Sequence, residues 1–502
     1  MFRRISVLVV LVHAMALLLR AQGPAVTVPR TWDDRAVAAL EVPLATPEYS
    51  PRHVSSDYYY RMPVRQIYRS YPVYAPGREP AGYIEWLAQQ EPEVVFDSAT
   101  LHSESDWIRA GELVFDAPIR FESLATTPAR FAEFYQKSGV RLAADGTLPY
   151  KRYVVRQKGI VELGNLSCAQ CHTRVMSDGS VLKGAQGNFP EGFFFAARPR
   201  RALQNGRDPK QLLAAWRGVV RRQYGAPWIQ PPPEGDRDMS LEDILSAYES
   251  QPPGVAVREG TSLRYAAQVP DLIGLKDRRY LDHTGLVRHR SIGDLMRYAA
   301  LNQDTQQIAR YGDFIPEGRD FRELPHPSTQ SRYSDEQLYA LAMYLYSLKP
   351  PPNPNKFDAL AAQGESVFTR ERCTRCHTPP LYTNNKLTPA EGFTIPSGHA
   401  ERFDVMATSV GTDPNSALKT RRGTGYYKVP SLRGVWYRGP FEHNGSVATL
   451  EDWFDPRRLD NDYVPTGHIG YGLKTRAVKG HRFGLDLSAA DKKALIAFLK
   501  TL

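Results

Sequence analysis

The chain has 502 residues, of which 42% are apolar and 24% are charged, and its formal net charge is +10. This balance excludes an intrinsically disordered chain, a collagen-like fibre and a multi-span membrane protein. The length predicts several domains, and 39 prolines together with 37 glycines favour long loops over continuous helical repeats.

The first 22 residues are typical of a secretory signal. Two arginines precede a mostly apolar run from Ile5 to Leu19, and small or polar residues follow at positions 21–23. Because a spanning helix needs about 20 apolar residues, we expect export to the periplasm and no integral membrane domain once the signal is removed. An uncleaved signal anchor is the alternative. Loss of the three arginines in this segment lowers the net charge from +10 to +7, which in an exported protein favours acidic protein partners or bound anionic groups over nucleic acid.

Residues 23–105 form an N-terminal extension that is rich in tyrosine and arginine. The segments Asp57–Arg61 and Tyr68–Tyr71 interleave the two residue types. Such a pattern can bind nucleic acid or an anionic surface, but it more often forms a strap whose arginines point to solvent or to bound carboxylates. We expect an irregular structural extension that wraps over the following domains.

The spacing of the cysteines is the most specific signal in the chain. All four lie in two segments, Cys168-Ala169-Gln170-Cys171-His172 and Cys373-Thr374-Arg375-Cys376-His377. C-x-x-C-H is the attachment signature of haem c, in which each thiol adds to one vinyl group and the histidine is the proximal ligand of the iron. The sequence therefore predicts two covalently bound haem c groups, held by these four cysteines, with His172 and His377 as iron ligands.

Two other readings of the cysteines are weaker. A thioredoxin-like dithiol does not require a histidine after the second cysteine. A zinc site with four thiolate ligands would need the two pairs close in sequence, whereas about 205 residues separate Cys168 from Cys373.

An aromatic cluster follows the first C-x-x-C-H segment. It contains Phe189 and the run Phe193–Phe195. The cluster predicts either an apolar wall that shapes a substrate pocket or ordinary packing against haem. Arg198, Arg200 and Arg201 come next, and we expect them either to pair with haem propionates, which bidentate arginine suits, or to be solvated.

Five landmarks recur in the same order around the two C-x-x-C-H segments. They are an opening helix (110–115 and 363–368), the C-x-x-C-H itself, a V-P-x-L loop (269–272 and 429–432), an H-x-G loop (283–285 and 443–445) and a closing helix after Ser334 or Ser488. The two loops recur at a constant offset of 160 residues. The first copy is longer, with 57 residues between Gly111 and Cys168 against 9 between Gly364 and Cys373, so we expect large insertions in it.

Each closing helix carries its own start signal. Ser334 is followed three residues later by Gln337, and Ser488 by Asp491, a spacing that caps a helix N-terminus. Leucines then recur at helical spacing and predict one buried stripe. The proline-rich segment 350–355 between the copies predicts a stiff linker.

These observations predict a mainly α fold with two cytochrome c-like helical haem domains. We assign a signal to residues 1–22, the N-terminal extension to 23–105, the first haem domain with its insertions to 106–350 and the second to 351–502. We expect little regular sheet, and haems near the domain interface.

The second half resembles the bacterial di-haem cytochrome c peroxidase family, which includes the MauG-type enzymes. The segment Gly423–Gly434 is similar to that family's TG…KVPxLR segment, and His443–Leu450 to its H-D/N-G-S…T-L segment. The resemblance covers roughly residues 106–502 and is strongest after residue 423. A similarity of spacing to the rubber-oxygenase branch is much weaker.

The resemblance implies a division of labour between the haems. The His377 haem would be six-coordinate and relay electrons, and the His172 haem would meet peroxide or oxygen. It also implies a small electron-donor protein, of the cytochrome or cupredoxin type, as partner. A calcium ion between the domains is a further family feature, for which we name no ligands.

The chain departs from the family on the distal side of the first haem. Aligning the H-x-G loops places Asp282-His283-Thr284-Gly285 where the family has F-W-D-G-R, so a histidine replaces the bridging tryptophan. Asp304 is the one carboxylate near the position of the family's distal glutamate. We therefore predict it as a candidate acid–base residue, with a helix cap or turn as the alternative.

The sixth iron ligands need a separate argument. For the second haem we favour His481, seven residues before Ser488, with His468 and Met406 as alternatives; Tyr463 and Tyr471 are also present in the region. For the first haem the corresponding position is His326, and His289 and Met176 are lesser candidates. A surface histidine is the alternative for each.

Two functions remain open from the sequence. The first is a peroxidase-like oxidoreductase that reduces peroxide or uses oxygen, which the family resemblance and the asymmetry between the halves favour. The second is a non-enzymatic electron carrier with both irons six-coordinate, which the missing distal residues favour.

Overall fold

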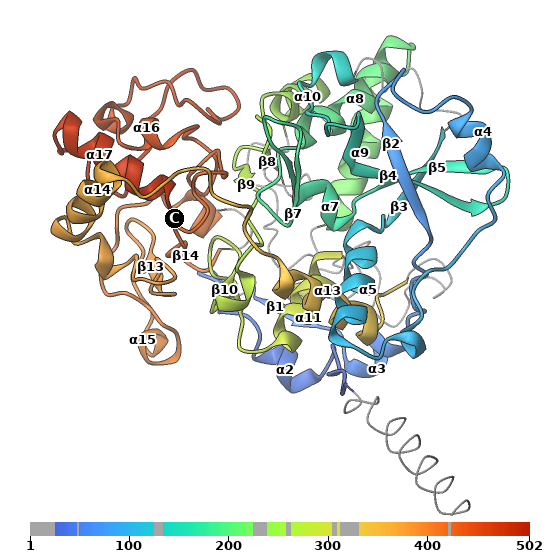
Figure 1. Cartoon of the computed structure of the whole chain (residues 1–502), viewed down its shortest axis with the longest axis horizontal. Coiled ribbons are helices and arrows are strands. Elements are labelled where there is room, and N and C mark those ends of the chain that lie inside the picture. Colours follow the sequence, from blue (N-terminus) through green and yellow to red (C-terminus); the bar gives the residue numbers. More distant parts are fainter. Residues whose placement is uncertain are drawn as a thin grey trace, which may run out of the picture.

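The structure, a computed structural model, describes residues 26–47, 50–124, 134–223, 238–257, 263–303, 309–311, 331–419 and 423–502. Within these ranges no helix has both the length and the apolar character needed to cross a membrane. Figure 1 shows the second half of the chain, residues 351–502, beside a larger first half that ends at residue 350.

Two helix pairs form the frame of the two halves. In the first half α5 (Glu104–Asp116) crosses α13 (Asp335–Ser347), and in the second α14 (Ala359–Arg370) crosses α17 (Ala489–Lys500). A Cβ atom at Gly111 would lie 2.0 Å from the carbonyl oxygen of Ala340, and one at Gly364 would lie 2.0 Å from that of Ala494. Both crossings therefore need glycine, because backbone and side chain cannot share that space. The expected opening and closing helices are confirmed.

Serine caps begin both closing helices, as predicted. The Ser334 hydroxyl accepts from the backbone N–H of Gln337, whose side chain accepts from the Ser334 N–H in return. At α17 the Ser488 hydroxyl accepts from the N–H of Asp491. These bonds satisfy N–H groups that have no partner within the helix.

The first half contains more sheet than the sequence predicted. Four antiparallel strands run in the order β2-β4-β5-β3, with bounds Ser70–Tyr74 (β2), Arg120–Ser123 (β3), Thr147–Gln157 (β4) and Ile160–Asn165 (β5). Partly buried and buried residues alternate over Thr147–Tyr150 at the start of β4, most of its remaining residues are buried, and Gly159, at φ 85°, makes the tight β4–β5 turn. The expectation of a mainly helical fold thus holds only in part: helices predominate, but the insertion before Cys168 forms a sheet.

Helices and short strands complete the first half. They are α2 (Asp34–Ala38), β1 (Pro51–His53), α3 (Ser56–Arg61), α4 (Tyr83–Ala88), η2 (Ser98–Thr100), α7 (Cys168–Cys171), β6 (Thr173–Val175), β7 (Val181–Lys183), α8 (Glu191–Gln204), α9 (Pro209–Gln223), α10 (Leu241–Glu249), β8 (Val255–Ala256), β9 (Ala267–Gln268), η5 (Leu275–Asp277), β10 (Tyr280–Leu281), β11 (Val287–Arg288), α11 (Ile292–Gln303) and β12 (Ala309–Tyr311).

The N-terminal extension is part of the core of the first half. Trp32 is completely buried and stacks on Tyr59, with ring centroids 4.7 Å apart. Strand β2 of this extension pairs with β4, and the extension also meets the second half, where the N–H of Ala45 donates to the carbonyl of Gly423. Of the tyrosines in the segments 57–61 and 68–71, Tyr59 is buried and the others are partly buried.

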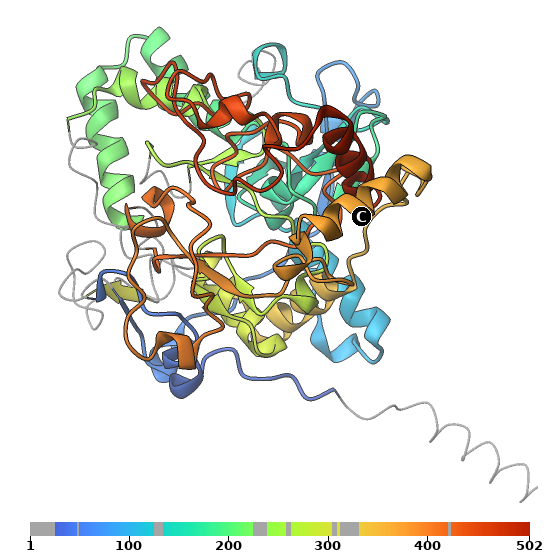
Figure 2. The ribbon, with the colours of Figure 1, turned by 90° about the vertical axis from the view of Figure 1, so that its left-hand side faces the viewer.

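Short elements and loops make up the rest of the second half (Figure 2). They are η8 (Cys373–Arg375), β13 (Leu387–Pro389), α15 (His399–Arg402), η9 (Asn415–Lys419), β14 (Tyr426–Lys428), α16 (Leu450–Trp453) and η10 (Pro456–Leu459). The linker packs on α17, since the side chain of Asn353 donates to the carbonyl of Lys500.

Candidate haem-binding sites

The first C-x-x-C-H segment sits on a single helical turn, α7. The Ser167 hydroxyl caps this turn, and His172 follows it directly. The Nδ1 of His172 lies 3.0 Å from the carbonyl oxygen of Pro270 in the V-P-x-L loop. Because a carbonyl only accepts, Nδ1 carries the proton and Nε2 keeps the lone pair that a metal would use.

The second segment repeats this arrangement. Cys373–Arg375 forms the short helix η8, and the Nδ1 of His377 lies 3.1 Å from the carbonyl oxygen of Tyr382. The backbone of Pro430, in the second V-P-x-L loop, is a further hydrogen-bond partner of the His377 ring. Burial, with a smaller contribution from the charge of His481, lowers the pKa of His377 to about 4, so the ring is neutral near pH 7 and can act as a ligand.

The thiols do not have the properties of a redox dithiol or of a zinc site. Burial raises the pKa of Cys168 to about 12 and that of Cys373 to about 11, whereas reactive dithiols have lowered values. Within the described part of the chain, no three His, Cys, Asp or Glu side chains are grouped to hold a metal ion. The raised thiol pKa values argue against a redox dithiol.

His481 faces His377 in the second half. The centroids of the two imidazole rings lie 6.2 Å apart. With a metal–imidazole bond of about 2 Å and about 1.1 Å from nitrogen to ring centre, two imidazoles on opposite sides of one metal have centres roughly 6.3 Å apart. Burial lowers the pKa of His481 as well, which keeps it neutral.

The alternatives to His481 have other surroundings. The sulfur of Met406 accepts from the amide of Asn384 at 3.8 Å, and the hydroxyl of Tyr471 donates to Asp243 at 2.6 Å. His468 is buried, and its Nδ1 has no hydrogen-bond partner among the described residues. Burial, followed by the charge of Arg476, lowers the pKa of His468 to about 4.

The candidates for the first iron are less well placed. His289 uses both ring nitrogens, with Nδ1 2.7 Å from the Arg278 carbonyl and Nε2 2.6 Å from the Tyr346 hydroxyl. Met176 packs in a small apolar cluster with Ile273. Asp304 and His326 lie outside the residues that the structure describes.

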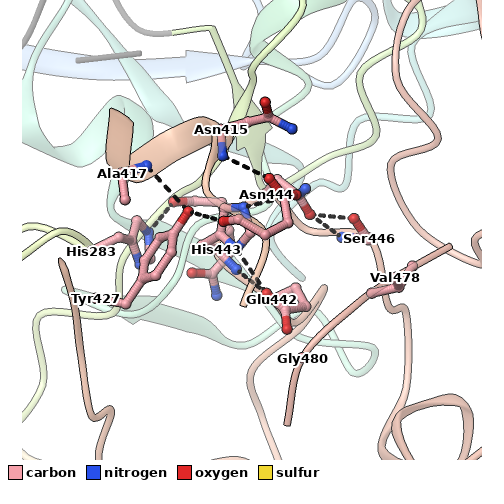
Figure 3. Close-up of polar contacts among 12 residues, drawn as sticks. His283, Asn415, Ala417, Tyr427, Glu442, His443, Asn444, Ser446, Val478 and Gly480 are labelled. Carbon is pink, nitrogen blue, oxygen red and sulfur yellow. Dashed lines mark hydrogen bonds and ion pairs between the residues drawn. The ribbon is translucent and has the colours of Figure 1, made fainter. Parts of the chain in front are cut away.

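Each H-x-G loop meets the residue before the V-P-x-L loop of the other half, and Figure 3 shows His283, Tyr427 and His443 close together. The N–H of Gln268 donates to the carbonyl of His443, and the N–H of Lys428, 160 positions later, donates to the carbonyl of His283; both distances are 3.0 Å. The residue before each histidine, Asp282 or Glu442, has positive φ, 68° and 71°. The repeat seen in the sequence is thus also a repeat of backbone geometry.

The side chains of the paired histidines differ. The Nε2 of His283 lies 2.7 Å from the Gln268 carbonyl, back toward the first V-P-x-L loop. The ring of His443 lies against Tyr427, and its Nδ1 is 2.8 Å from a carboxylate oxygen of Glu442. Burial, the largest single cause, would raise the pKa of Glu442, but the hydrogen bonds from the side chain and backbone of His443, together with the charges of His443 and Arg458, lower that pKa overall.

A basic cluster lies near the same boundary and was not predicted from the sequence. It combines Arg278, Lys428 and Arg438 with the carboxylates of Asp271 and Asp282. Burial, followed by repulsion from Arg278, lowers the pKa of Lys428 to about 7. Asp277 is a further charge partner of Arg278. The cationic side chains of this cluster could donate to carboxylates such as haem propionates.

The aromatic cluster packs against the sheet rather than lining an open space. Phe189 and Phe194 are buried with Tyr150 and Phe134. The ammonium of Lys151, 1% exposed, lies 3.7 Å from the centroid of the Phe194 ring. Phe189 and Phe194 thus pack on protein side chains, while Phe195 is 41% exposed.

Side chains from distant parts of the chain surround the first C-x-x-C-H. Lys151 donates to Asn165, and Gln170, between the two cysteines, donates to both carboxylate oxygens of Glu191 at 2.9 Å. The guanidinium of Arg200 contacts Glu242 and Glu249, so protein carboxylates already engage it.

Haem c fits the chemistry of these residues. Each segment offers two cysteines outside any disulfide and a histidine whose Nδ1 meets a backbone carbonyl, which leaves Nε2 as the nitrogen that would bind iron. The second also offers a facing imidazole at the spacing of a shared metal, and the Nδ1 of His481 is buried with no hydrogen-bond partner among the described residues. The Lys428 cluster offers cations for propionates.

Comparisons with known proteins give a partial match. No family model matches the chain. Methylamine utilization protein MauG of Paracoccus denitrificans is 28% identical over 169 residues, which cover 29% of this chain and 43% of that protein. Cytochrome-c peroxidase IdrP2 of Pseudomonas sp. (strain SCT) is 25% identical over 197 residues, covering 32% and 47%. The chain thus spans less than half the length of these curated relatives, and the likeness confirms the resemblance that the motifs indicated.

Two solved structures are also similar to parts of the chain. Hydrazine synthase of Kuenenia stuttgartiensis is 15% identical with a TM-score of 0.27, covering 57% of this chain and 87% of that one. A MauG-like protein associated with microbial copper homeostasis is 20% identical with a TM-score of 0.22, covering 34% and 56%.

Proposed function

We propose that the protein is an exported di-haem c-type oxidoreductase of the cytochrome c peroxidase type. One haem would be bound by Cys168, Cys171 and His172 in a domain spanning residues 106–350. The other would be bound by Cys373, Cys376 and His377 in a domain spanning 351–502. Similarity to MauG and to cytochrome-c peroxidases supports this class of function.

The 6.2 Å spacing between the rings of His377 and His481 carries the proposal. It supports a second haem with histidine on both sides, an arrangement suited to storing and passing electrons. At the first site His289 is engaged by Arg278 and Tyr346, which argues against it as a second ligand. The asymmetry supports a relay at His377 and a reactive site at His172.

When bound, haem c supplies reversible one-electron storage and, where an iron position is open, a place for peroxide or oxygen. The chain's own contribution begins with the carbonyl of Pro270, which fixes the tautomer and orientation of His172. The carbonyl of Tyr382 does the same for His377. Buried cations near Lys428 would hold the propionates.

A continuous path of bonds connects the two haem-binding histidines. It runs from His172 to the carbonyl of Pro270 and along the chain to Gln268, whose carbonyl meets the His283 ring at 2.7 Å. The His283 carbonyl then accepts from Lys428 at 3.0 Å, two residues before Pro430 beside His377. We propose this path, with His283 in place of the family's tryptophan, for electron passage from the second site to the first.

The proposed setting is the periplasm, reached through the signal in residues 1–22. A small electron-donor protein would deliver electrons to the second site, and peroxide or oxygen would accept them at the first. The periplasmic setting and both partners follow from the family resemblance and from the apolar N-terminal run.

Low-temperature EPR on the purified holoprotein tests this function. Spectra would be recorded fully oxidised and half-reduced, before and after peroxide. One low-spin signal with a second, high-spin signal that peroxide consumes in either redox state supports the enzyme. Two low-spin signals that ignore peroxide in both states would instead establish the electron carrier.

A further inference from the structure

Arg458, in η10, is a large charged side chain with no exposed surface. Its guanidinium donates only to backbone carbonyls: Nε to Trp453 at 2.9 Å, Nη1 to Val478 at 2.6 Å, and Nη2 to Gly480 at 3.0 Å and His481 at 2.8 Å. A buried cation is costly unless its donors are paired. These hydrogen bonds connect Arg458 to Val478, Gly480 and His481, which all lie in the segment that carries the proposed ligand.

The segment held by Arg458 has a strained backbone. His481 has φ of +47°, the left-handed region that side chains with a Cβ rarely adopt, and Gly480 has φ of +90°. A Cβ atom at Gly480 would lie 2.7 Å from the Cα of Thr412, so this glycine is pressed against another loop. Strained residues persist only where their surroundings over-determine them, and Arg458 supplies the bonds on one side of this turn.

Two backbone hydrogen bonds hold the same segment further. The N–H of His481 donates to the carbonyl of Val410 at 2.8 Å, and the N–H of Val478 donates to the carbonyl of Arg458 at 2.6 Å. The guanidinium lies 5.4 Å from the centroid of the Trp453 ring, and that ring lies 5.4 Å from the His481 ring. The same arginine thus contacts both the backbone of His481 and the aromatic wall beside its imidazole.

We propose that Arg458 is a positioning residue that holds the imidazole of His481 opposite His377. Its planar fork keeps the strained turn from relaxing, and this relaxation would move the imidazole off the iron. Lysine cannot replace it fully, because one ammonium cannot reach all the carbonyls that Nε and the two Nη atoms contact around the edge of the guanidinium plane. The inference rests on the proposed role of His481 as a ligand of the second haem.

The test uses the holoprotein with Arg458→Met and Arg458→Lys, and Arg457→Met as the matched control. Arg457 is the adjacent residue, its side chain is 78% exposed, and it pairs with Asp455. We expect Arg458→Met to convert much of the second haem from low to high spin in EPR. The affinity of that haem for added imidazole should rise by about tenfold or more. Arg458→Lys should be intermediate, and Arg457→Met should match the wild type.

The outcomes separate this inference from the proposed function. If His481→Ala leaves the low-spin signals unchanged, the ligand assignment fails, and the role of Arg458 fails with it. If His481→Ala abolishes one low-spin signal while folded Arg458→Met keeps it and its imidazole affinity, the positioning role alone is wrong. If neither Arg458 variant yields folded holoprotein while Arg457→Met does, Arg458 is needed for folding in general. That outcome would overturn its proposed role in positioning His481.

Discussion

The two C-x-x-C-H segments are surrounded by the same set of helices and loops, but the side chains that face their histidines differ. In both halves a glycine allows two helices to cross, a V-P-x-L loop meets the histidine, and an H-x-G loop with positive φ reaches the other half. In the second half a short chain brings His481 to face His377. In the first half, insertions build a sheet and His289 is engaged elsewhere. The two halves thus share a repeated set of helices and loops, and the described parts of the two sites differ in the side chains around the histidine.

Removing the attachment cysteines should have the largest effect. Replacing Cys168 and Cys171 by serine should halve the haem content per chain and leave the low-spin signal of the second site. Replacing Cys373 and Cys376 should also halve the haem content but remove that signal. Haem content from the pyridine haemochrome, read with EPR, checks both. An unchanged haem content in either double variant would show that its segment binds no haem covalently.

The next largest effect should distinguish the two facing histidines. His481→Ala should convert the second haem to high spin and let it bind added imidazole, because its iron loses the ligand opposite His377. His289→Ala should leave the spin state of both haems unchanged, because both its ring nitrogens already have protein partners. EPR of the oxidised holoproteins provides the comparison. A spectral change in the His289 variant alone would reverse our view of the two halves.

Alanine at the helix crossings should destabilise both halves. At Gly111 and Gly364 the new methyl group would meet a carbonyl oxygen at 2.0 Å. Overpacking of this kind costs about 1–3 kcal/mol or more in the free energy of unfolding. Denaturant unfolding measures the loss, and Ser366→Ala on the exposed face of α14 is the control. If Gly111→Ala or Gly364→Ala is as stable as Ser366→Ala, the two helices can move apart at that crossing with little loss in the free energy of unfolding.

A smaller effect is expected on electron passage between the haems. His283→Ala removes the ring that bridges to the Gln268 carbonyl and should slow the transfer several-fold, measured by flash photolysis of the half-reduced protein. His443→Ala should slow it less, since that ring bonds to Glu442 instead. Equal rates in both variants and the wild type would exclude the path through His283.

The smallest effect concerns pH and Lys428. Burial lowers the pKa of Lys428 to about 7 from 10.5. Without anions nearby, the Lys428 ammonium of the folded chain would lose its proton above about pH 7, whereas that of the unfolded chain would keep it until about pH 10. The free energy of unfolding would therefore rise as the pH rises from about 7 to about 10. Propionates beside Lys428 would keep it charged and remove the rise. Denaturant midpoints of the holoprotein should thus be flat over this range. A rise that Lys428→Met abolishes would show that no anion neutralises this lysine.

Some of these features depend on short stretches of sequence and could be predicted. The C-x-x-C-H segments need only a few consecutive residues, and a cap such as Ser334 with Gln337 needs four. The opening and closing helices were predictable because the same order of landmarks occurs twice in the chain, whereas their crossing at Gly111 and Gly364 is seen only in the structure. The resemblance to MauG and the peroxidases came from equally local motifs near residues 423–450.

Other features depended on the tertiary structure, because they join residues that are far apart in the chain. The sequence offered His481, His468 and Met406 for one position, and only the folded chain shows which ring faces His377. The sheet was missed because insertions have no counterpart in the repeat. Arg458 and the Lys428 cluster gave no signal either, since a buried charge is defined by its neighbours. The sequence by itself thus determined which residues can attach haem, and the tertiary structure decided what surrounds them.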